Sequence, residues 1–176
     1  ETLSALEWAY SSGRAHYLGL SHRDTWDCAL MWAQSDQVPL AAVEEEYSLL
    51  CSSPLLDRAR YNGFGFLAHS PLAGGVLTGK YRHTTPPDSR AASAHLRSSV
   101  APYLESSLPI VEALSQAAHG LECSITDVAL AWVEGTPGVT SAIIGPRNLV
   151  QLEQILNGRI ELPLPIRQVL SEVSAK

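Results

Sequence analysis

Charged residues are scarce in this chain of 176 residues: they make up 17% of it, with 12 Lys and Arg against 18 Asp and Glu. The resulting net charge of −6 argues against a nucleic-acid partner, because binding to a phosphate backbone needs clustered basic residues. The sequence also lacks an apolar run of about 18 residues and a basic leader followed by an apolar stretch. We therefore expect a cytoplasmic protein with no membrane partner.

Cysteine is rare and follows no metal-binding pattern. The chain has 3 cysteines, Cys28, Cys51 and Cys123, which are odd in number and widely separated. This pattern indicates reduced, buried thiols rather than disulfides or a metal site. A catalytic cysteine would need a paired base, and the sequence identifies none. With 45% apolar residues, the composition is ordinary for one globular domain.

The apolar pattern predicts helices that alternate with strands. The expected order is helix 2–12, strand 14–21, helix 25–35, strand 40–47, helix 54–62, strand 64–69, helices 109–119 and 125–134, strand 139–144, and helices 148–156 and 166–173. Strands that alternate with helices imply a parallel sheet, so we expect an α/β fold. Residues 82–107 are rich in Pro, Ser, Arg and Thr, and we expect one long loop there.

The segment 64–81 is the most informative part of the sequence. It runs from a short apolar strand into a loop that contains Gly74, Gly75, Gly79 and Lys80. Glycines let the backbone approach a ligand closely, and the lysine supplies a positive charge beside exposed amide groups. This chemistry suits a phosphate, and α/β proteins hold ligands in loops at strand ends. The alternative is a mobile surface loop whose glycines serve only turns.

Several strings of this sequence resemble those of one family, in the same order. Ser70-Pro-Leu-Ala-Gly-Gly75, followed by Thr78-Gly-Lys-Tyr81, resembles the cofactor-covering loop of the aldo-keto reductases, NADPH-dependent carbonyl reductases built on a (β/α)8 barrel. The other matching strings are Tyr17-Leu-Gly-Leu-Ser21, Glu46-Tyr-Ser-Leu-Leu50, Val128-Ala-Leu-Ala-Trp132, Gly138-Val-Thr-Ser141 and Ile143-Ile-Gly145, with Gln151-Leu-Glu153 following.

The resemblance covers essentially the whole chain but only the C-terminal half of such a reductase. Four expected strands are too few to close a (β/α)8 barrel, which needs about 250 residues. We therefore expect the α/β fold to be the C-terminal half of a (β/α)8 TIM barrel of aldo-keto reductase type. Residues 1–176 would form a single partial domain, with barrel strands 5–8, their helices and a C-terminal helix. Segment 82–107 would be a long cofactor or substrate loop.

The function implied by the resemblance is the NADPH-dependent reduction of an aldehyde or ketone to an alcohol, with this chain supplying the cofactor-binding half. In the family an Asp, Tyr, Lys and His set on earlier strands performs the reduction, so we name no catalytic residue here. The implied partners are a small-molecule carbonyl substrate and the missing N-terminal half of the barrel or another copy. Two alternatives stay open: an inactive nucleotide-binding or regulatory homologue, and a half-barrel that assembles with another chain and binds no NADPH.

By the same resemblance, the nicotinamide end of the cofactor would meet residues near the ends of the strands. Ser21 and His22 stand where the family uses a Ser-Asn pair for the nicotinamide carboxamide. Glu44 replaces a glutamine that pairs with the same amide, and an ionised carboxylate can only accept hydrogen bonds. His69 stands where an aromatic residue lies against the nicotinamide, and a histidine ring can also stack. These departures predict weaker contacts at this end.

The phosphates and the adenosine of the cofactor would meet the glycine-rich loop. Ser70, Leu72, Gly74 and Lys80 match the part of the family's loop that wraps the pyrophosphate and the adenosine. Arg90 matches a downstream basic residue that is often found near the same phosphates. We expect this loop to be the main phosphate-binding segment.

A second phosphate-facing segment contains Gly145 and Arg147 and precedes a helix, whose free amides and dipole favour an anion. Arg147 would pair with the 2′-phosphate that distinguishes NADPH from NADH, since a guanidinium binds phosphate through two bonds. Gln151 matches a family contact on the same helix. Gln154 and Ile155 stand where a Glu-Asn pair usually holds the adenine.

A metal site is an alternative use of the strand ends. His22, Glu44, Glu46 and His69 would lie near the same ends of neighbouring parallel strands, and imidazoles with carboxylates can bind a divalent cation. Their spacing matches no known metal motif, so we predict no metal. We expect instead that Glu45 points outward while Glu44 and Glu46 face the barrel interior.

Tryptophan is expected to serve packing rather than substrate stacking. The 4 tryptophans lie at core spacing on the expected helices. They are Trp8, Trp26, Trp32 and Trp132.

Overall fold

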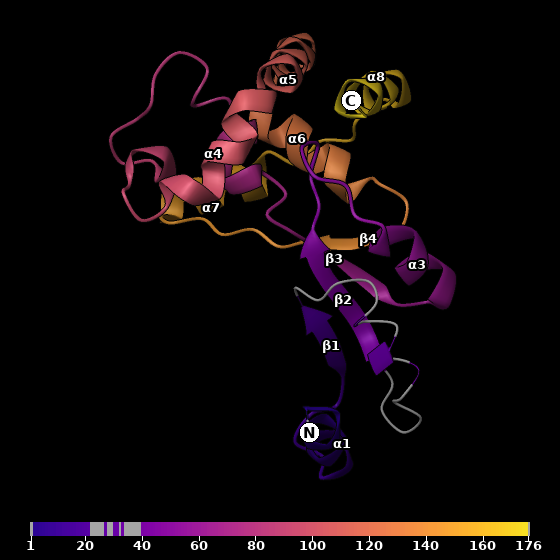
Figure 1. The fold of residues 1–176 in the computed structure, drawn as a ribbon. Coiled ribbons are helices and arrows are strands. Elements are labelled where there is room, and N and C mark those ends of the chain that lie inside the picture. Colours follow the sequence, from indigo (N-terminus) through magenta and orange to yellow (C-terminus); the bar gives the residue numbers. More distant parts are fainter. Residues whose placement is uncertain (1, 22–26, 28–29, 32, 34–39, 176) are drawn as a thin grey trace.

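The computed structural model describes residues 2–21, 27, 30–31, 33 and 40–175. Its two termini lie at opposite ends of the molecule (Figure 1). The elements are α1 (Thr2–Ser11), β1 (Leu18–Ser21), β2 (Leu40–Glu46), α3 (Leu55–Asn62), β3 (Gly65–His69), the short 3-10 helices η1 (Ala73–Thr78) and η2 (Arg90–Ala92), α4 (Arg97–Ser106), α5 (Leu108–Gly120), α6 (Ile125–Glu134), β4 (Val139–Ala142), α7 (Leu149–Asn157) and α8 (Leu164–Ser174). The helix expected over 25–35 lies largely outside the described residues.

The described strands form one parallel sheet in the order β1-β2-β3-β4. The predicted α/β class with a parallel sheet is therefore confirmed. The helices that follow β3 lie together toward the carboxyl ends of the strands, and α1 lies at the opposite end (Figure 1). Loops that leave those carboxyl ends can consequently meet one another, as in other α/β folds.

The two faces of the sheet have different chemistry. Leu20, Val43 and Phe66 are register partners on neighbouring strands, and all are buried. The next residues along β1 and β2, Ser21 and Glu44, are also register partners but remain exposed or partly buried. Because side chains alternate along a strand, one face is the apolar core and the other carries a polar row.

The three consecutive glutamates of β2 follow this alternation. The Glu45 carboxylate accepts a hydrogen bond from the Ser53 hydroxyl, just before α3. Glu45 therefore lies on the helix-covered face, and Glu44 and Glu46 share the opposite face. The outward orientation predicted for Glu45 agrees with this contact.

An aromatic cluster joins the sheet to α6 and α8. The Tyr47 ring stacks on Trp132, with ring centroids 5.6 Å apart, and meets Phe66 edge to face at 5.8 Å. The Trp132 indole Nε1 donates to the Ser171 hydroxyl on α8 at 3.0 Å. Phe66 is fully buried, and burial of such a side chain contributes about 1.5–3 kcal/mol. The prediction that Trp132 packs in the core is confirmed.

The carboxyl end of α6 is capped by an arginine from α8. The Arg167 guanidinium donates to the backbone oxygens of Ala131 and Trp132, each at 2.7 Å. These carbonyls lie in the last turn of α6, where an arginine also interacts favourably with the helix dipole. Burial lowers the pKa of the Arg167 guanidinium, although it stays a cation at any physiological pH.

The first helix departs from expectation. No residue of α1 is buried, and 58% of Trp8 is exposed. The guanidinium carbon of Arg14 lies 4.3 Å from the centroid of the Trp8 ring. The prediction that Trp8 packs in the core is wrong, because more than half of this side chain is exposed. Trp26 and Trp32 lie outside the described residues.

The segment 82–107 is not one uninterrupted loop. It contains η2 and the ten-residue helix α4, which includes Pro102 in its interior. A proline costs a helix one hydrogen bond, so the sequence gives no strong helix signal here. Val100 of α4 is nevertheless fully buried, and it lies against Gly74 of η1. This packing stabilises a helix for which the local sequence signal is weak.

Two helix starts are capped by side chains. At α6 the Ser124 hydroxyl accepts from the Asp127 backbone N–H at 3.1 Å, and the Asp127 carboxylate accepts from the Ser124 N–H at 2.9 Å. At α7 the Asn148 side-chain oxygen accepts from the Gln151 N–H at 2.9 Å. Within the part of the chain that the structure describes, no helix is long and apolar enough to cross a membrane.

Candidate functional site

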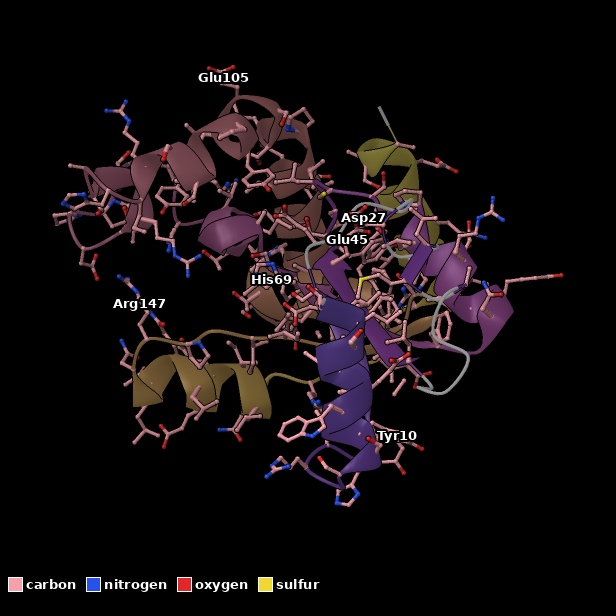
Figure 2. All side chains as sticks on the ribbon, turned by 60° about the horizontal axis from the view of Figure 1, so that its bottom comes forward. Tyr10, Asp27, Glu45, His69, Glu105 and Arg147 are labelled. Atoms are coloured by element: carbon pink, nitrogen blue, oxygen red, sulfur yellow. The ribbon has the colours of Figure 1, made fainter. Side chains whose placement is uncertain are left out.

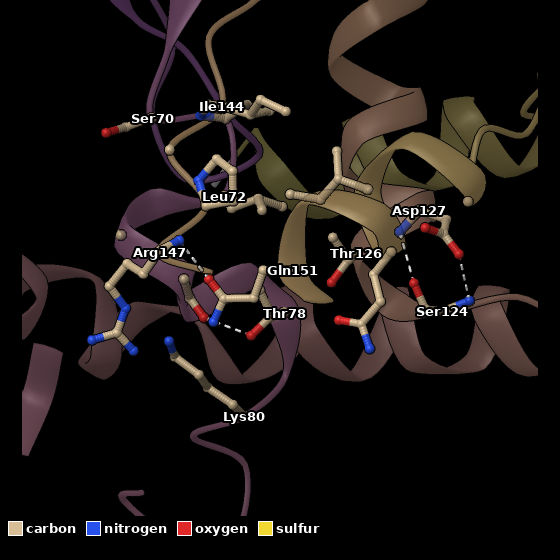
Figure 3. Close-up of a pocket in the computed structure, with 18 of the residues that line it drawn as sticks. Ser70, Leu72, Thr78, Lys80, Ser124, Thr126, Asp127, Ile144, Arg147 and Gln151 are labelled. Atoms are coloured by element: carbon tan, nitrogen blue, oxygen red, sulfur yellow. Dashed lines mark hydrogen bonds between the residues drawn. The ribbon is translucent and has the colours of Figure 1, made fainter. Parts of the chain in front are cut away.

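A cavity of about 670 Å³ opens where the end of β3, the loop around η1, the start of α6 and the segment from β4 to α7 meet (Figure 3). Most of the residues that the sequence singled out as cofactor contacts line it. They are His69, Ser70, Leu72, Gly74, Lys80, Arg90, Gly145, Arg147, Gln151 and Gln154. Segments more than 60 residues apart in sequence thus contribute to one site.

Cations from separate segments line the same cavity. Lys80 follows η1, Arg90 begins η2, and Arg147 precedes α7. Lys80 and Arg147 lie on the same side of the cavity (Figure 3). Three positive charges around one cavity favour a ligand with several negative charges, because pairing with an anion offsets their mutual repulsion.

The backbone of the loop leaves room for Lys80. Gly75 has a φ of +96°, and a Cβ on it would lie only 2.7 Å from the Lys80 Nζ atom. Gly74 has a φ of +64°, and a Cβ on it would lie 2.6 Å from the Cγ1 atom of Val100. Both positions therefore favour glycine for their backbone conformation, and Gly74 also for space. The Lys80 ammonium lies beside the Gly75 backbone, 5.1 Å from the centroid of the Tyr81 ring.

Two residues of the loop adopt backbone angles that are rare without glycine. Ser70 has a φ of 50° and Ala73 a φ of 47°. Each such residue costs about 1–3 kcal/mol and persists where the surrounding structure enforces it. Here Ala73 is fully buried, and its N–H donates to the Ser70 carbonyl at 2.8 Å. The strain lies at the point where β3 turns into the cavity wall.

The exit of the loop is anchored to α5 and to η2. The Arg82 guanidinium makes two bonds to the Glu112 carboxylate, at 2.9 and 2.7 Å, and a third to the Ser115 hydroxyl at 2.9 Å. The Tyr81 hydroxyl accepts from the Ala91 N–H at 3.3 Å. These contacts fix the backbone directly after Lys80 and directly after Arg90.

The segment before α7 is organised by its own side chains. The Arg147 N–H donates to the Gln151 side-chain oxygen at 2.9 Å. The Arg147 guanidinium donates through Nη1 to the backbone oxygen of Asp88 at 2.9 Å, which joins this segment to the chain just before η2. A guanidinium has five N–H donors, so one such bond leaves donors that can meet an anion.

The cavity also has a wall that the sequence did not predict. Ser124, Thr126 and Asp127 from the start of α6 line it, together with Asn157 and Gly158 from the end of α7. The capping box at Ser124 and Asp127 marks a helix start in the sequence, but nothing local shows that this helix start faces a cavity. Only the packing of α6 against the loop and α7 shows this.

The structure places the residues proposed for the nicotinamide end in two different regions. His69 lines the cavity, whereas Ser21 and Glu44 lie in the polar row of the sheet and do not line it. The register partner of His69 is Glu46, two residues along β2 from Glu44. Two residues of a strand span about 6.6 Å, so the polar row lies next to the cavity rather than in it. His22 lies outside the described residues.

Glu46 has a specific partner on α4. The Tyr103 hydroxyl donates to the Glu46 carboxylate at 2.5 Å. Burial raises the pKa of the Tyr103 hydroxyl strongly, and the bond to the Glu46 carboxylate raises it further. This bond attaches α4 to the end of β2. Among the described residues, no group of three or more His, Cys, Asp or Glu side chains is arranged to hold a metal ion.

A family model, described as the aldo/keto reductase family, matches residues 1–171. The chain belongs to the aldo/keto reductase family. It is 34% identical to the L-glyceraldehyde 3-phosphate reductase of Escherichia coli K12, over 88% of this chain and 47% of that protein. It is 30% identical to a probable voltage-gated potassium channel subunit beta of Oryza sativa subsp. japonica, over 99% of this chain and 56% of that protein.

A solved structure shares the fold of this aldo/keto reductase chain. The thermostable aldo-keto reductase Tm1743, in complex with the inhibitor epalrestat, matches with a TM-score of 0.71 and 21% identity, over 98% of this chain and 54% of that one. The chain therefore spans about half the length of the proteins it matches. Its parallel sheet accounts for about half of the strands of a (β/α)8 barrel.

Members of the aldo/keto reductase family generally bind a nicotinamide dinucleotide, and the cavity fits the phosphates of such a group. Lys80, Arg90 and Arg147 supply positive charge, and Gly75 leaves space beside the lysine. The Asp127 carboxylate also lines the cavity, but it accepts the Ser124 N–H as part of the helix cap. The donor set therefore matches a polyanion bound near the start of α7.

Proposed function

We propose that this chain supplies the cofactor-binding part of an NADPH-dependent reductase that converts an aldehyde or ketone to an alcohol. The observation that supports this best is the meeting of Lys80, Arg90 and Arg147 around one cavity, at the carboxyl end of a parallel sheet in an aldo/keto reductase. The preference for NADPH over NADH rests on Arg147, whose remaining guanidinium donors suit a 2′-phosphate.

The residues of this chain would bind and orient the cofactor. Lys80 and Arg90 would neutralise the pyrophosphate, while the amides of the loop and of the α7 start would donate to its oxygens. His69, at the end of β3, would stack on the nicotinamide ring, with Ser21 and Glu44 toward its carboxamide. Bound NADPH supplies the hydride, and by resemblance the groups that protonate the carbonyl oxygen lie outside this chain.

A binding and turnover experiment tests this proposal. The purified protein is titrated with NADPH and with NADH, and bound cofactor is followed by its fluorescence. We expect NADPH to bind at least tenfold more tightly than NADH, because a bidentate charge-assisted contact is worth about 1.5–3 kcal/mol. Oxidation of NADPH is then measured with a panel of aldehydes and ketones. Equal affinities for the two cofactors would contradict the role of Arg147.

A second function is favoured by a separate observation. The similarity to a probable voltage-gated potassium channel subunit beta, with Glu44 in place of a glutamine, supports an inactive nucleotide-binding homologue with a regulatory role. The same panel separates the two, since tight NADPH binding without turnover of any carbonyl supports the regulatory function. Loss of NADPH binding altogether would instead support a half-barrel that only assembles with another chain.

The sheet itself points to a further partner. In the described sheet, β1 and β4 are the outer strands, and each has one side without a neighbouring described strand. We infer that these sides pair with further strands, from the rest of a longer chain or from another copy, and that the assembly works in the cytoplasm. Intact mass and light scattering of the purified protein distinguish these sources, while a compact monomer of 19.0 kDa would contradict both.

A further inference from the structure

Two asparagines of the chain are followed directly by glycine, and each pair lies at the carboxyl end of a helix. Asn62-Gly63 ends α3, and Asn157-Gly158 ends α7. A glycine has no Cβ that would shield its own backbone nitrogen from the side chain before it. An asparagine before glycine is therefore open to attack by that nitrogen, unless the surrounding structure keeps the two groups apart.

The pair at the end of α3 is held by several contacts. The Asn62 side-chain nitrogen donates to the backbone oxygen of Arg58 at 2.8 Å. Gly63 has a left-handed φ of 76°, and its N–H and the N–H of Phe64 donate to carbonyls of the last turn. The helix also has buried residues that pack in the core. These contacts keep the Asn62 side chain away from the Gly63 nitrogen.

The pair at the end of α7 is held by far less. The Asn157 side chain is exposed, and no hydrogen bond joins it to the part of the chain that the structure describes. The Gly158 N–H donates to the Gln154 oxygen at 3.0 Å, and no residue of α7 is buried. Helix ends with few buried contacts open most readily. Opening of this one bond frees the Gly158 nitrogen to reach the Asn157 side chain.

The reaction between these two groups needs only water. The Gly158 nitrogen attacks Cγ, the carbonyl carbon of the Asn157 side chain. A bond from this nitrogen to Cγ forms, the bond from Cγ to Nδ2 breaks, and the NH2 group leaves as ammonia with the proton that the Gly158 nitrogen gives up. Water then opens the cyclic imide at either of its carbonyls. The product is an aspartate or an isoaspartate, and in both cases the chain gains one carboxylate.

The new carboxylate would lie in the wall of the cavity. Asn157 and Gly158 both line it, and so does Asp127. The Asp127 carboxylate packs so closely on Gly158 that a Cβ at this glycine would overlap it. A second carboxylate beside Asp127 makes this wall more negative, and a more negative wall disfavours an anionic ligand.

We propose that Asn157 is a site of spontaneous deamidation, and that the carboxylate it gains weakens the binding of a polyanion in the cavity. The second part rests on the proposed function, since it takes Lys80, Arg90 and Arg147 as the phosphate site. The modification itself does not depend on a ligand, because both reacting groups belong to this chain. The cavity therefore loses affinity for a polyanion as the protein ages.

The modification is tested by incubating the purified protein without nucleotide at neutral and at mildly alkaline pH. Peptide mass spectrometry follows the mass increase that marks each conversion of an amide to an acid. We expect Asn157 to convert about fivefold or more faster than Asn62, because the side-chain hydrogen bond of Asn62 must also break. The rate should rise with pH, since the glycine nitrogen must lose its proton. Asn157→Gln should abolish the mass increase of this peptide.

The effect on binding is tested by titrating NADPH, followed by its fluorescence, into Asn157→Asp. We expect binding about twofold to fivefold weaker than in the wild type at low salt, and a smaller loss at high salt, because salt screens the new charge. Asn62→Asp adds the same charge at the end of α3, outside the cavity, and should leave the affinity unchanged. Aged wild-type protein should lose affinity in proportion to the conversion of Asn157.

The outcomes separate this inference from the proposed function. Conversion of Asn62 at an equal or higher rate, or no conversion of Asn157, would overturn the assignment of the modification. Equal affinity of Asn157→Asp and the wild type at low salt would overturn the effect on binding and leave the proposed function standing. If the unmodified protein does not bind NADPH, the proposed function fails together with the effect on binding, while the peptide masses still decide whether Asn157 is modified.

Discussion

The charged end of the cavity, lined by Lys80, Arg90 and Arg147, and the polar row of the sheet are positioned in different ways. Around the cavity, Arg82 and Tyr81 anchor the loop, and Arg147 joins two segments that are distant in sequence. In the polar row, Ser21 and Glu44 owe their place to strand register. In the view of Figure 2, His69 lies between Arg147 and Glu45. The contacts that shape the charged end thus come from within the chain, whereas a polar row on a barrel face is completed by neighbouring strands.

The sharpest test of this comparison is Arg147→Ala. We expect NADPH to bind about tenfold to hundredfold more weakly, because a charge-assisted contact to a phosphate is lost, while NADH affinity changes little. The measurement is the pair of dissociation constants. Arg159→Ala is the matched control, since the Arg159 side chain is 72% exposed and only pairs with Glu134 at 3.7 Å. Equal losses for the two cofactors would place the 2′-phosphate elsewhere.

The glycine beneath the lysine gives the next largest effect. Gly75→Ala adds a Cβ 2.7 Å from the Lys80 Nζ atom and puts an alanine at a φ of +96°. We expect a loss of about 1–3 kcal/mol in the free energy of unfolding and about tenfold weaker NADPH binding. Denaturant unfolding and titration measure the two. Gly120→Ala meets no atom within 4 Å and should be neutral or slightly stabilising.

The link between α4 and the sheet is tested by Tyr103→Phe. Loss of the bond to the Glu46 carboxylate should lower the free energy of unfolding by about 1.5–3 kcal/mol at pH 7. Because the pKa of Tyr103 is raised in the folded protein, this hydroxyl stabilises the fold fully below its unfolded pKa near 10.0 and stabilises it less as the pH rises further. The free energies of unfolding of the wild type and of Tyr103→Phe should therefore approach each other above about pH 10. A constant difference up to pH 11 would argue against this bond.

The smallest effect is expected in the polar row. Glu44 lies beside the cavity rather than in its wall, so Glu44→Gln would alter only a contact to the carboxamide, and NADPH affinity should change by less than about threefold. Titration measures it directly. A gain of tenfold or more would show that the polar row binds the cofactor as strongly as the charged end does, and the comparison between the two regions would break down.

The parts of the fold and the cavity that the sequence predicted are those with short-range signals. A strand followed by glycines and Lys80, and Arg147 before an asparagine cap, are each readable within about ten residues. The alternation of side chains along β2 likewise predicts that Glu45 lies on the opposite face from Glu44 and Glu46. These signals identified both segments of the charged end. Their meeting around one cavity follows from a parallel sheet, in which loops leave the same edge.

The parts that the sequence did not predict depend on contacts between distant segments. Helix α4 contains Pro102 and has no side-chain cap, so its local signal is weak, and it is held by Val100 packing on Gly74 and by Tyr103. Thr126 lines the cavity because α6 packs beside α7, which no local motif reports. The exposed Trp8 shows that helical spacing alone does not predict burial, because a helix also needs a surface to pack against.

The arginine cap on α6 has a consequence for the cavity. One end of this ten-residue helix carries Thr126, and the other is held by Arg167 from the last helix of the chain. A helix of that length spans about 15 Å and behaves as a stiff rod. Removing α8, or replacing Arg167, would therefore loosen the proposed nucleotide site from a distance, through a helix that moves as one piece.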